Sequence, residues 1–208
     1  MSGLSYEALR PSHAALLYPH LSDARLYAFI PEDPPVSATS LEERYRFLVA
    51  GPPCGEERWL NYVLCEGGHP VGTLQATVQA DGVALIAYMV FAQSQRRGYA
   101  RAGCRWLLEQ LFSRGEVHTV RAHIDTENAA SIALAESLGL RRVTTLVEAD
   151  HFKGRSSDEF VYEMDRSDYD SSGTSRGDAE PTVELDRRGL SRSTVEQGTA
   201  PDSASRRR

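Results

Sequence analysis

The sequence predicts an α+β fold in which a mixed, mostly antiparallel central sheet of about seven strands is flanked by helices. Two observations carry this prediction. Strand-like apolar runs are joined by glycine-containing turns in the middle of the chain. Segments with apolar residues at helical spacing lie before and after these runs. The expected order is strand, two helices, three strands, helix, strand, helix and two strands.

Composition bounds the kind of protein. The chain has 208 residues, 41% of them apolar and 25% charged, which suits one domain with a full hydrophobic core. No run of about 18 apolar residues occurs, so no membrane partner is expected. The N-terminus lacks a basic start followed by an apolar block, so a cytoplasmic location is the default expectation. The net charge of −6 argues weakly against a nucleic-acid partner and is compatible with a cationic small substrate.

The cysteines indicate neither a disulfide framework nor a metal site. Cys54, Cys65 and Cys104 are odd in number and follow no CxxC or histidine-paired spacing. We therefore expect reduced thiols and no bound metal. The sequence leaves the choice between a monomer and a homodimer open.

The first third of the chain predicts one strand and two helices. Residues 5–10 alternate as a strand, and residues 12–30 show helical spacing until a proline-rich stretch interrupts them. Ser40 and Glu43 form a capping-box pattern for the second helix, which Gly51 ends.

The next part predicts an antiparallel meander. Residues 58–67, 70–78 and 82–91 have strand-like patterns, and the turns between them carry Gly67-Gly68 and Asp81-Gly82. The last run is apolar on nearly every position, as expected of a central strand covered on both faces.

The remainder predicts helix, strand, helix and two closing strands. An amphipathic helix runs to about Ser113, a strand covers residues 117–125, and a helix follows that is capped by Asn128 and stopped by Gly139. From Ser167 onward no sustained apolar period occurs, so we expect a folded domain over residues 1–166 and a disordered tail over 167–208.

The turn "QRRGYA", residues 95–100, has the features of an anion site. Gly98 permits backbone angles closed to other residues, and the first amides of the following helix have no intrahelical partner. Together with the helix dipole, such amides favour a phosphate, and Arg96 and Arg97 add positive charge. On this pattern alone, a glycine-capped turn with two solvated arginines is an equally good interpretation.

The element order changes that balance. The "QRRGYA" turn resembles the Gln/Arg-x-x-Gly-x-Gly/Ala signature of the GNAT superfamily of N-acetyltransferases. The stretches "AYMVFAQSQRRGYA", "HIDTENAASIALAESLGLRR" and "FKGRSSDEFVYEMD" are similar to its Rim-type branch, and the resemblance covers residues 4–166. It implies a sheet that splays at the cofactor site and an acetyl-CoA-dependent transfer to a primary amine of a small molecule or a peptide N-terminus. The amine would attack the thioester directly in a ternary complex.

The resemblance also implies a set of cofactor-binding residues. Main-chain groups of the apolar strand would pair with the pantetheine arm, amides of the turn would hold the pyrophosphate, and the start of the late helix would reach the cofactor or only cap the helix. These residues are Met89, Val90, Phe91, Gln95, Arg96, Arg97, Gly98, Tyr99, Ala100, Arg101 and Asn128.

The acid and base depart from the family pattern. Leu85 stands where Rim-type members often have glutamate, and Ala135 stands where many relatives have a tyrosine acid. By analogy with relatives that use serine there, Ser131 is the expected catalytic residue and protonates the leaving thiolate. His123 is a candidate base, although a packed or surface histidine is the more common situation. The altered positions keep an alternative open: a catalytically inactive acyl-CoA-binding sensor or interaction protein.

The acceptor pocket is expected between the early helices, the strand from residue 58 and the late hairpin. Tyr27, Phe29 and Trp59 are candidates to line it, although such aromatic residues are more often core. The carboxylates that could attract an amine are Glu42, Glu43, Glu56 and Glu57, for which a solvated surface position is the alternative. The arginines that end the chain suggest a nucleic-acid role only weakly, because the tail holds about as many acidic as basic residues.

Overall fold

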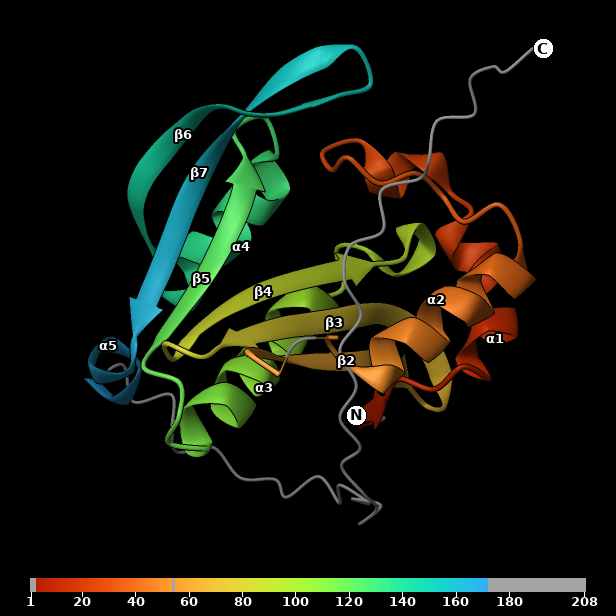
Figure 1. Ribbon diagram of the computed structural model, residues 1–208, viewed down its shortest axis with the longest axis horizontal. Coiled ribbons are helices and arrows are strands. Elements are labelled where there is room, and N and C mark those ends of the chain that lie inside the picture. Colours follow the sequence, from red (N-terminus) through yellow and green to blue (C-terminus); the bar gives the residue numbers. More distant parts are fainter. Residues whose placement is uncertain (1–2, 54, 172–208) are drawn as a thin grey trace, which may run out of the picture.

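The computed structural model describes residues 3–53 and 55–171 and contains a seven-stranded sheet of order β1-β2-β3-β4-β5-β7-β6 (Figure 1). Neighbouring strands are antiparallel except for β4 and β5, which are parallel. The strands are β1 (Leu4–Ala8), β2 (Glu57–Glu66), β3 (His69–Gln79), β4 (Val83–Val90), β5 (Thr119–Asp125), β6 (Arg141–Phe152) and β7 (Arg155–Asp165). The helices are α1 (His13–Leu21), α2 (Ala38–Ala50), α3 (Tyr99–Ser113), α4 (Ala129–Leu138) and α5 (Arg166–Ser171), with 3-10 turns η1 (Ala24–Tyr27) and η2 (Ala92–Ser94). The predicted α+β class is confirmed.

The central strands β4 and β5 separate after a short paired segment. Their pairing covers only Val83–Leu85 against Thr119–Arg121, although β4 continues to Val90 and β5 to Asp125. Figure 1 shows the two strands diverging from their common start. The expected splay is therefore present, and it leaves backbone of β4 without a strand partner on one side.

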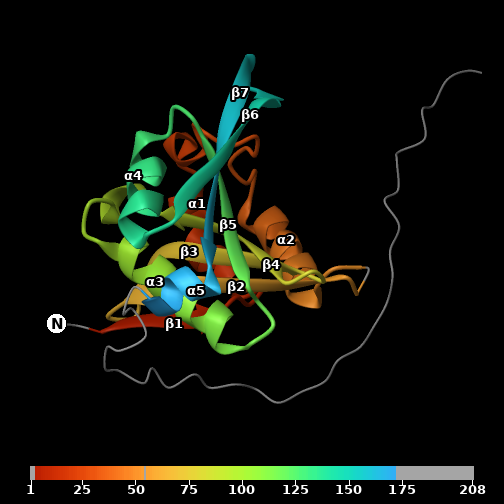
Figure 2. The ribbon, with the colours of Figure 1, turned by 90° about the vertical axis from the view of Figure 1, so that its left-hand side faces the viewer.

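Helices cover both faces of the sheet. Figure 2 shows α3 and α4 on one side of the strands and α2 on the other. Under α3 the core includes Leu107, Leu111 and Val120, each fully buried. The second core lies between α1, α2 and the sheet and includes Leu17 and Phe91, both 0% exposed. Burial of such side chains contributes roughly 1.5–3 kcal/mol each, and it fixes the helices on which the site is built.

Helix α2 begins three positions earlier than its sequence pattern suggests. Ser37, in extended conformation, is the N-cap; its hydroxyl accepts from the Ser40 N–H at 3.0 Å, and the Ser40 hydroxyl accepts from the Ser37 N–H at 3.1 Å. The predicted box of Ser40 with Glu43 is wrong, because a serine can take the third helical position as well as the cap. Gly51 ends the helix as expected, with φ 85°.

The ordered domain extends past the predicted boundary at residue 166. Arg166–Ser171 form α5, and the Tyr169 ring packs against Phe112 with ring centroids 4.8 Å apart. The expectation of disorder from residue 167 is therefore wrong for 167–171, because burial of Tyr169 (5% exposed) offsets the ordering cost of this turn. Residues 172–208, to which the rest of the expectation refers, lie outside the described residues.

Cys65 and Cys104 are buried free thiols. Burial raises the pKa of Cys65 to about 11 and that of Cys104 to about 12, so both stay protonated and unreactive at neutral pH. Cys54 lies outside the described residues. Within the described part of the chain, no helix is long and apolar enough to cross a bilayer, and no group of His, Cys, Asp and Glu could hold a metal ion.

Gly72 sets how closely β3 approaches β4, which gives a first prediction. A Cβ at residue 72 would lie 2.4 Å from the Met89 carbonyl oxygen and 3.2 Å from the Val90 Cα. Gly72→Ala should lower the free energy of unfolding by about 1–3 kcal/mol, as overpacking does, measured by urea denaturation. Gly55→Ala is the matched control, because a Cβ there meets nothing within 4 Å. Equal stability of the two variants would contradict the assigned contact.

Candidate active site

The start of α3 forms an open cradle of backbone amides. Gly98 is its N-cap in the left-handed conformation, with φ 83°, and a Cβ there would meet nothing within 4 Å. The helical hydrogen bonds begin with the Ala102 N–H, which donates to the Gly98 carbonyl at 3.0 Å. The N–H groups of residues 99–101 precede that bond and point out of the helix end. This is an anion-binding geometry, with the positive end of the helix dipole behind it.

The arginines around the cradle differ in what they contact. Arg97 lies 3.7 Å from a Glu66 carboxylate oxygen and 5.3 Å from the Tyr99 ring centroid, while the Tyr99 hydroxyl donates to the same carboxylate. Arg101 donates to the Ser137 carbonyl of α4 at 3.4 Å. Arg96 is exposed, adopts a positive φ of 61° and has no ion pair within the described residues. Of the three arginines at the cradle, Arg96 is therefore the one whose charge is most available to a ligand.

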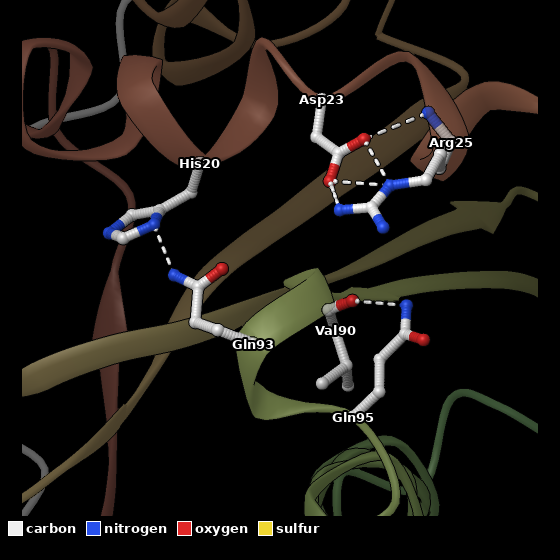
Figure 3. Close-up of polar contacts among 6 residues, drawn as sticks. All are labelled: His20, Asp23, Arg25, Val90, Gln93 and Gln95. Atoms are coloured by element: carbon white, nitrogen blue, oxygen red, sulfur yellow. Dashed lines mark hydrogen bonds and ion pairs between the residues drawn. The ribbon is translucent and has the colours of Figure 1, made fainter.

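At the end of β4, every second residue directs its backbone groups toward the gap that opens between β4 and β5. The Phe91 N–H donates to the Val71 carbonyl at 3.0 Å, so this amide is already used by β3. Main-chain groups of an extended strand point to alternate sides, so those of Val90 and Tyr88 face away from β3, toward the gap. The Val90 carbonyl accepts from the Gln95 side chain at 3.2 Å (Figure 3). The Val90 N–H is thus the donor that faces the gap at this end of the strand.

Two of the three predicted main-chain contacts are turned the other way. Met89 pairs with Thr73 of β3, and the Met89 carbonyl points at Gly72. Phe91 has a fully buried side chain and a bonded N–H. Neither residue presents its main chain to the gap, because both share the orientation that serves β3. The main chain of Tyr88 does face the gap, as that of Val90 does. The sequence did not predict this residue, because the register of β4 against β3 cannot be read from the sequence.

Helix α1 is fastened to the segment that follows β4. The His20 ring stacks on Phe91 with centroids 4.8 Å apart. It also hydrogen-bonds the Gln93 side chain of η2 (Figure 3). Beyond α1, the Asp23 carboxylate caps η1 through the Arg25 N–H at 3.0 Å and binds the Arg25 guanidinium at 2.6 Å. The His20 contacts hold the early segment against the open end of β4, and the Asp23 contacts order the turn that follows.

The first turn of α4 lies across the gap from β4. The Asn128 side chain accepts from the Ser131 N–H at 3.1 Å and so caps the helix. The Tyr88 hydroxyl, from β4, donates to the Ser131 carbonyl at 3.4 Å. Burial raises the pKa of Tyr88 to about 12, so the phenol is a protonated donor at neutral pH. Tyr88 of β4 and Ser131 of α4 therefore meet across the gap, and both residues carry a hydroxyl group.

Asp125 holds the turn from β5 to α4. Its carboxylate accepts from the Glu127 N–H at 2.8 Å, the Arg155 guanidinium at 2.6 Å and the Ser157 hydroxyl at 2.6 Å. Burial raises the pKa of Asp125, but these three donors outweigh burial and hold it below its ordinary value. The carboxylate thus fixes the direction in which Asn128 enters α4.

A cavity of about 510 Å³ lies between α2, the loop after η1 and the sheet, and it ends at β4. Tyr27 lines the cavity as expected, whereas Phe29 does not, and Trp59 instead packs on Phe47 with centroids 5.3 Å apart. The carboxylates at the cavity are Glu32 and Asp33. The predicted carboxylates, Glu42, Glu43, Glu56 and Glu57, are not among its lining residues.

The late hairpin contacts the loop of this cavity through the only lysine of the chain. Lys153 Nζ donates to the carbonyls of Ile30 at 2.7 Å and Glu32 at 3.0 Å, and it lies 3.8 Å from Asp33. Figure 1 shows the tip of the β6–β7 hairpin leaning toward this part of the chain. The hairpin was expected to line the pocket. It does not line the cavity, and instead Lys153 binds the loop that does.

The two residues that depart from the family pattern, Ala135 and Leu85, and the candidate base His123 all lie in structural surroundings. Ala135 is 3% exposed and packs in the core under α3 and α4. Leu85 pairs with Arg121 in the last row before the strands separate. His123 is exposed on β5, hydrogen-bonds the Glu159 carboxylate at 3.0 Å and is not among the residues lining the cavity.

The splayed sheet, the amide cradle after β4 and the capped helix across the gap define an acyltransferase-type fold and site. The sequence matches the acetyltransferase (GNAT) domain family over residues 4–141, and the chain belongs to this family. The predicted resemblance is thereby confirmed.

The chain is similar to several named N-acetyltransferases. The chain is 36% identical over 88 residues to the ribosomal protein bS18 alanine N-acetyltransferase of Escherichia coli strain K12, an alignment covering 42% of this chain and 59% of that relative. Spermidine N-acetyltransferase from Vibrio cholerae, solved with CoA and spermine, has a TM-score of 0.71 at 20% identity over 81% of this chain and 99% of that one. RimL, a ribosomal L7/L12 alpha-N-protein acetyltransferase solved with coenzyme A, has a TM-score of 0.73 at 17% identity, covering 79% and 95%. The two structures show the shared fold.

The carboxylate of Asp125 gives a prediction of pH-dependent stability. A lowered folded pKa means that the stabilisation is present above the unfolded pKa of about 4 and is lost as the pH falls through the folded value. Asp125→Asn should cost about 3 kcal/mol at pH 7, and its deficit against the wild type should shrink below pH 4. Urea unfolding between pH 3 and 7 measures this, with the exposed Asp170→Asn as control. A deficit that is constant over the whole range would contradict the role of the charge.

Proposed function

We propose that this protein is an acetyl-CoA-dependent N-acetyltransferase acting on a primary amine of a small molecule or a peptide N-terminus by direct attack in a ternary complex. The observation that carries the proposal is that one strand serves two sites. On one side, β4 borders the gap that leads to the amide cradle of α3. On its acceptor side, Ala87, Tyr88 and Met89 line the cavity beside α2.

The donor site fits coenzyme A by its chemistry. The N–H groups of residues 99–101 would hold the pyrophosphate, and the open space over Gly98 leaves the helix end accessible. The backbone groups of Tyr88 that face the gap would pair with the amides of the pantetheine arm as an added strand does. When bound, the thioester supplies the activated acetyl group. Arg96 would contribute charge without fixing the geometry.

The residues of the chain then contribute position, polarisation and a proton. Holding both reactants against β4 converts an encounter in solution into a reaction within one complex. The Val90 N–H is the donor available to the acetyl carbonyl oxygen. Ser131 is the proposed proton donor to the sulfur as the nitrogen–carbon bond forms and the carbon–sulfur bond breaks, and Tyr88, whose hydroxyl contacts the same turn of α4, is the second candidate. The attacking nitrogen releases one proton to water, and water returns one to the donor hydroxyl, so the transfer is balanced.

The names of the relatives support an amine acceptor without fixing it. They include enzymes named for an alanine of a ribosomal protein and for spermidine. The alternative, an inactive acyl-CoA-binding sensor, shares the donor site and differs only in lacking transfer. A panel of amines incubated with acetyl-CoA separates the two, because transfer releases free CoA thiol and a sensor binds CoA without releasing it. Binding of CoA with no thiol release from any amine would refute the enzyme proposal.

Gly98 provides a specific test of the cradle. Gly98→Val should abolish CoA binding, because a branched side chain is strained at φ 83° and would stand where the anion lies. Arg96→Ala and Arg97→Ala should each weaken CoA only modestly, about three- to tenfold, as expected for exposed charges. Isothermal titration with CoA measures all three, and circular dichroism checks that Gly98→Val folds. Full affinity in the folded Gly98→Val variant would overturn the cradle assignment.

Ser131 and Tyr88 are distinguished by a pair of conservative variants. Ser131→Ala should lower kcat about 10²-fold while leaving CoA affinity within twofold, because the Oγ is proposed to act only on the leaving thiolate. Tyr88→Phe should lower kcat by less than tenfold if the phenol only ties β4 to α4. If Tyr88→Phe loses more turnover than Ser131→Ala, the proton donor is Tyr88.

A further inference from the structure

The acceptor cavity contains two buried phenols whose hydroxyl groups have no hydrogen-bond partner in the described part of the chain. Tyr27 is 6% exposed and Tyr45 is 5% exposed, and both line the cavity. Both hydroxyl groups remain accessible, since Trp106 Nε1 is the only fully buried side-chain polar atom without a partner among these residues. Two unused donors in one cavity therefore indicate a polar ligand group.

Arg44 supplies a positive charge at the same place. Leu41, Arg44, Tyr45 and Leu48 occupy positions i, i+3, i+4 and i+7 on one face of α2, and all four line the cavity. Burial raises the pKa of both phenols, and the nearby Arg44 guanidinium opposes that rise in each. Arg44 has no ion pair among the described residues, whereas Arg46, two positions on, is paired with Glu42. We call Tyr27, Arg44 and Tyr45 the Tyr-Arg cluster.

The charges of the cavity favour an anion at this cluster. The Glu32 carboxylate changes the pKa of Tyr27 less than the Arg44 guanidinium does, and Arg44 also lowers the pKa of Tyr45. Asp33 is already matched by Lys153 at 3.8 Å. A cationic group placed between the two phenols would face the Arg44 guanidinium, whereas a carboxylate would gain two hydroxyl donors and an arginine.

We propose that the Tyr-Arg cluster is a subsite for a carboxylate carried by the acceptor amine. The inference rests on the proposed acetyl transfer and deepens it, because it restricts the acceptor to amines that carry a carboxylate. The reactive amine would lie at the Tyr88–Met89 end of the same cavity and the carboxylate at the Tyr-Arg cluster. Two sources share this chemistry: the α-carboxylate of an amino acid, and an acidic side chain next to a peptide N-terminus.

Product analogues test the subsite without requiring turnover. The full-length protein, with and without CoA, is titrated calorimetrically with N-acetyl-L-amino acids and with N-acetyl dipeptide amides that carry aspartate in second position. Each probe is paired with its neutral match, the N-acetyl amino acid amide or the asparagine dipeptide. At least one carboxylate probe should bind about tenfold or more tightly than its match, the effect of one charge-assisted hydrogen bond. The arm that shows the difference identifies the source of the carboxylate.

Variants assign the effect to the cluster. Arg44→Gln should reduce the preference for the carboxylate to within twofold, and Tyr45→Phe, which removes one hydroxyl, should reduce it about fivefold. Arg46→Gln, on the same helix but paired with Glu42, is the matched control and should leave the preference unchanged. Because Arg44 is exposed, its variant keeps the test valid even if Tyr45→Phe fails to fold.

Three outcomes would overturn the subsite: every probe pair binding within twofold, N-acetylspermidine binding more tightly than all carboxylate probes, or Arg46→Gln and Arg44→Gln acting alike. The parallel titration with CoA separates the two proposals. If CoA binds and no carboxylate preference exists, the subsite is wrong and the donor site stands. If CoA does not bind, the proposed function fails, and the titrations without CoA still decide whether the cluster holds a carboxylate.

Discussion

The structure depends on the early end of pairing between β4 and β5. Parallel strands normally satisfy one another's main chain along their whole length, and here the pairing stops at Leu85. The cost of the unpaired backbone is offset by cores on both sides of the sheet, which hold β4 in place through Leu107 and Phe91 and their neighbours. The result is a fixed strand edge inside a folded protein, and such an edge can bind an extended ligand.

Further contacts fix the positions of β4 and β5 on the two sides of the gap. Tyr88 contacts the first turn of α4 from the β4 side, and Asp125 fixes the same turn from the β5 side. On the acceptor side, His20 holds α1 against the end of β4, and Lys153 holds the cavity loop to the late hairpin. The site is therefore assembled from five segments distant in sequence, and each has at least one specific polar or ring contact to a neighbour.

The two sides of β4 have different chemistry, and this division suits a two-substrate reaction. The donor side offers mostly backbone groups: the Val90 N–H and the amides of residues 99–101. In the proposed function, such groups would recognise features common to every acyl-CoA. The acceptor side offers side chains, including Tyr27, Tyr45 and Arg44, which can differ between relatives without disturbing the sheet. The shared fold of relatives with unlike named acceptors is consistent with this division.

By itself the sequence determined the α+β class, the strand order along the chain, the glycine cradle at Gly98 and the cap at Asn128. These features are local: each depends on residues within one turn or one apolar run, so composition and spacing reveal them. The tertiary structure alone decided which backbone groups of β4 face the gap, that Tyr88 meets Ser131, and that Tyr27 and Tyr45 share one cavity with Arg44. These contacts join residues far apart in the chain, and they depend on strand register and helix packing, where a shift of one residue would turn each side chain to the opposite face.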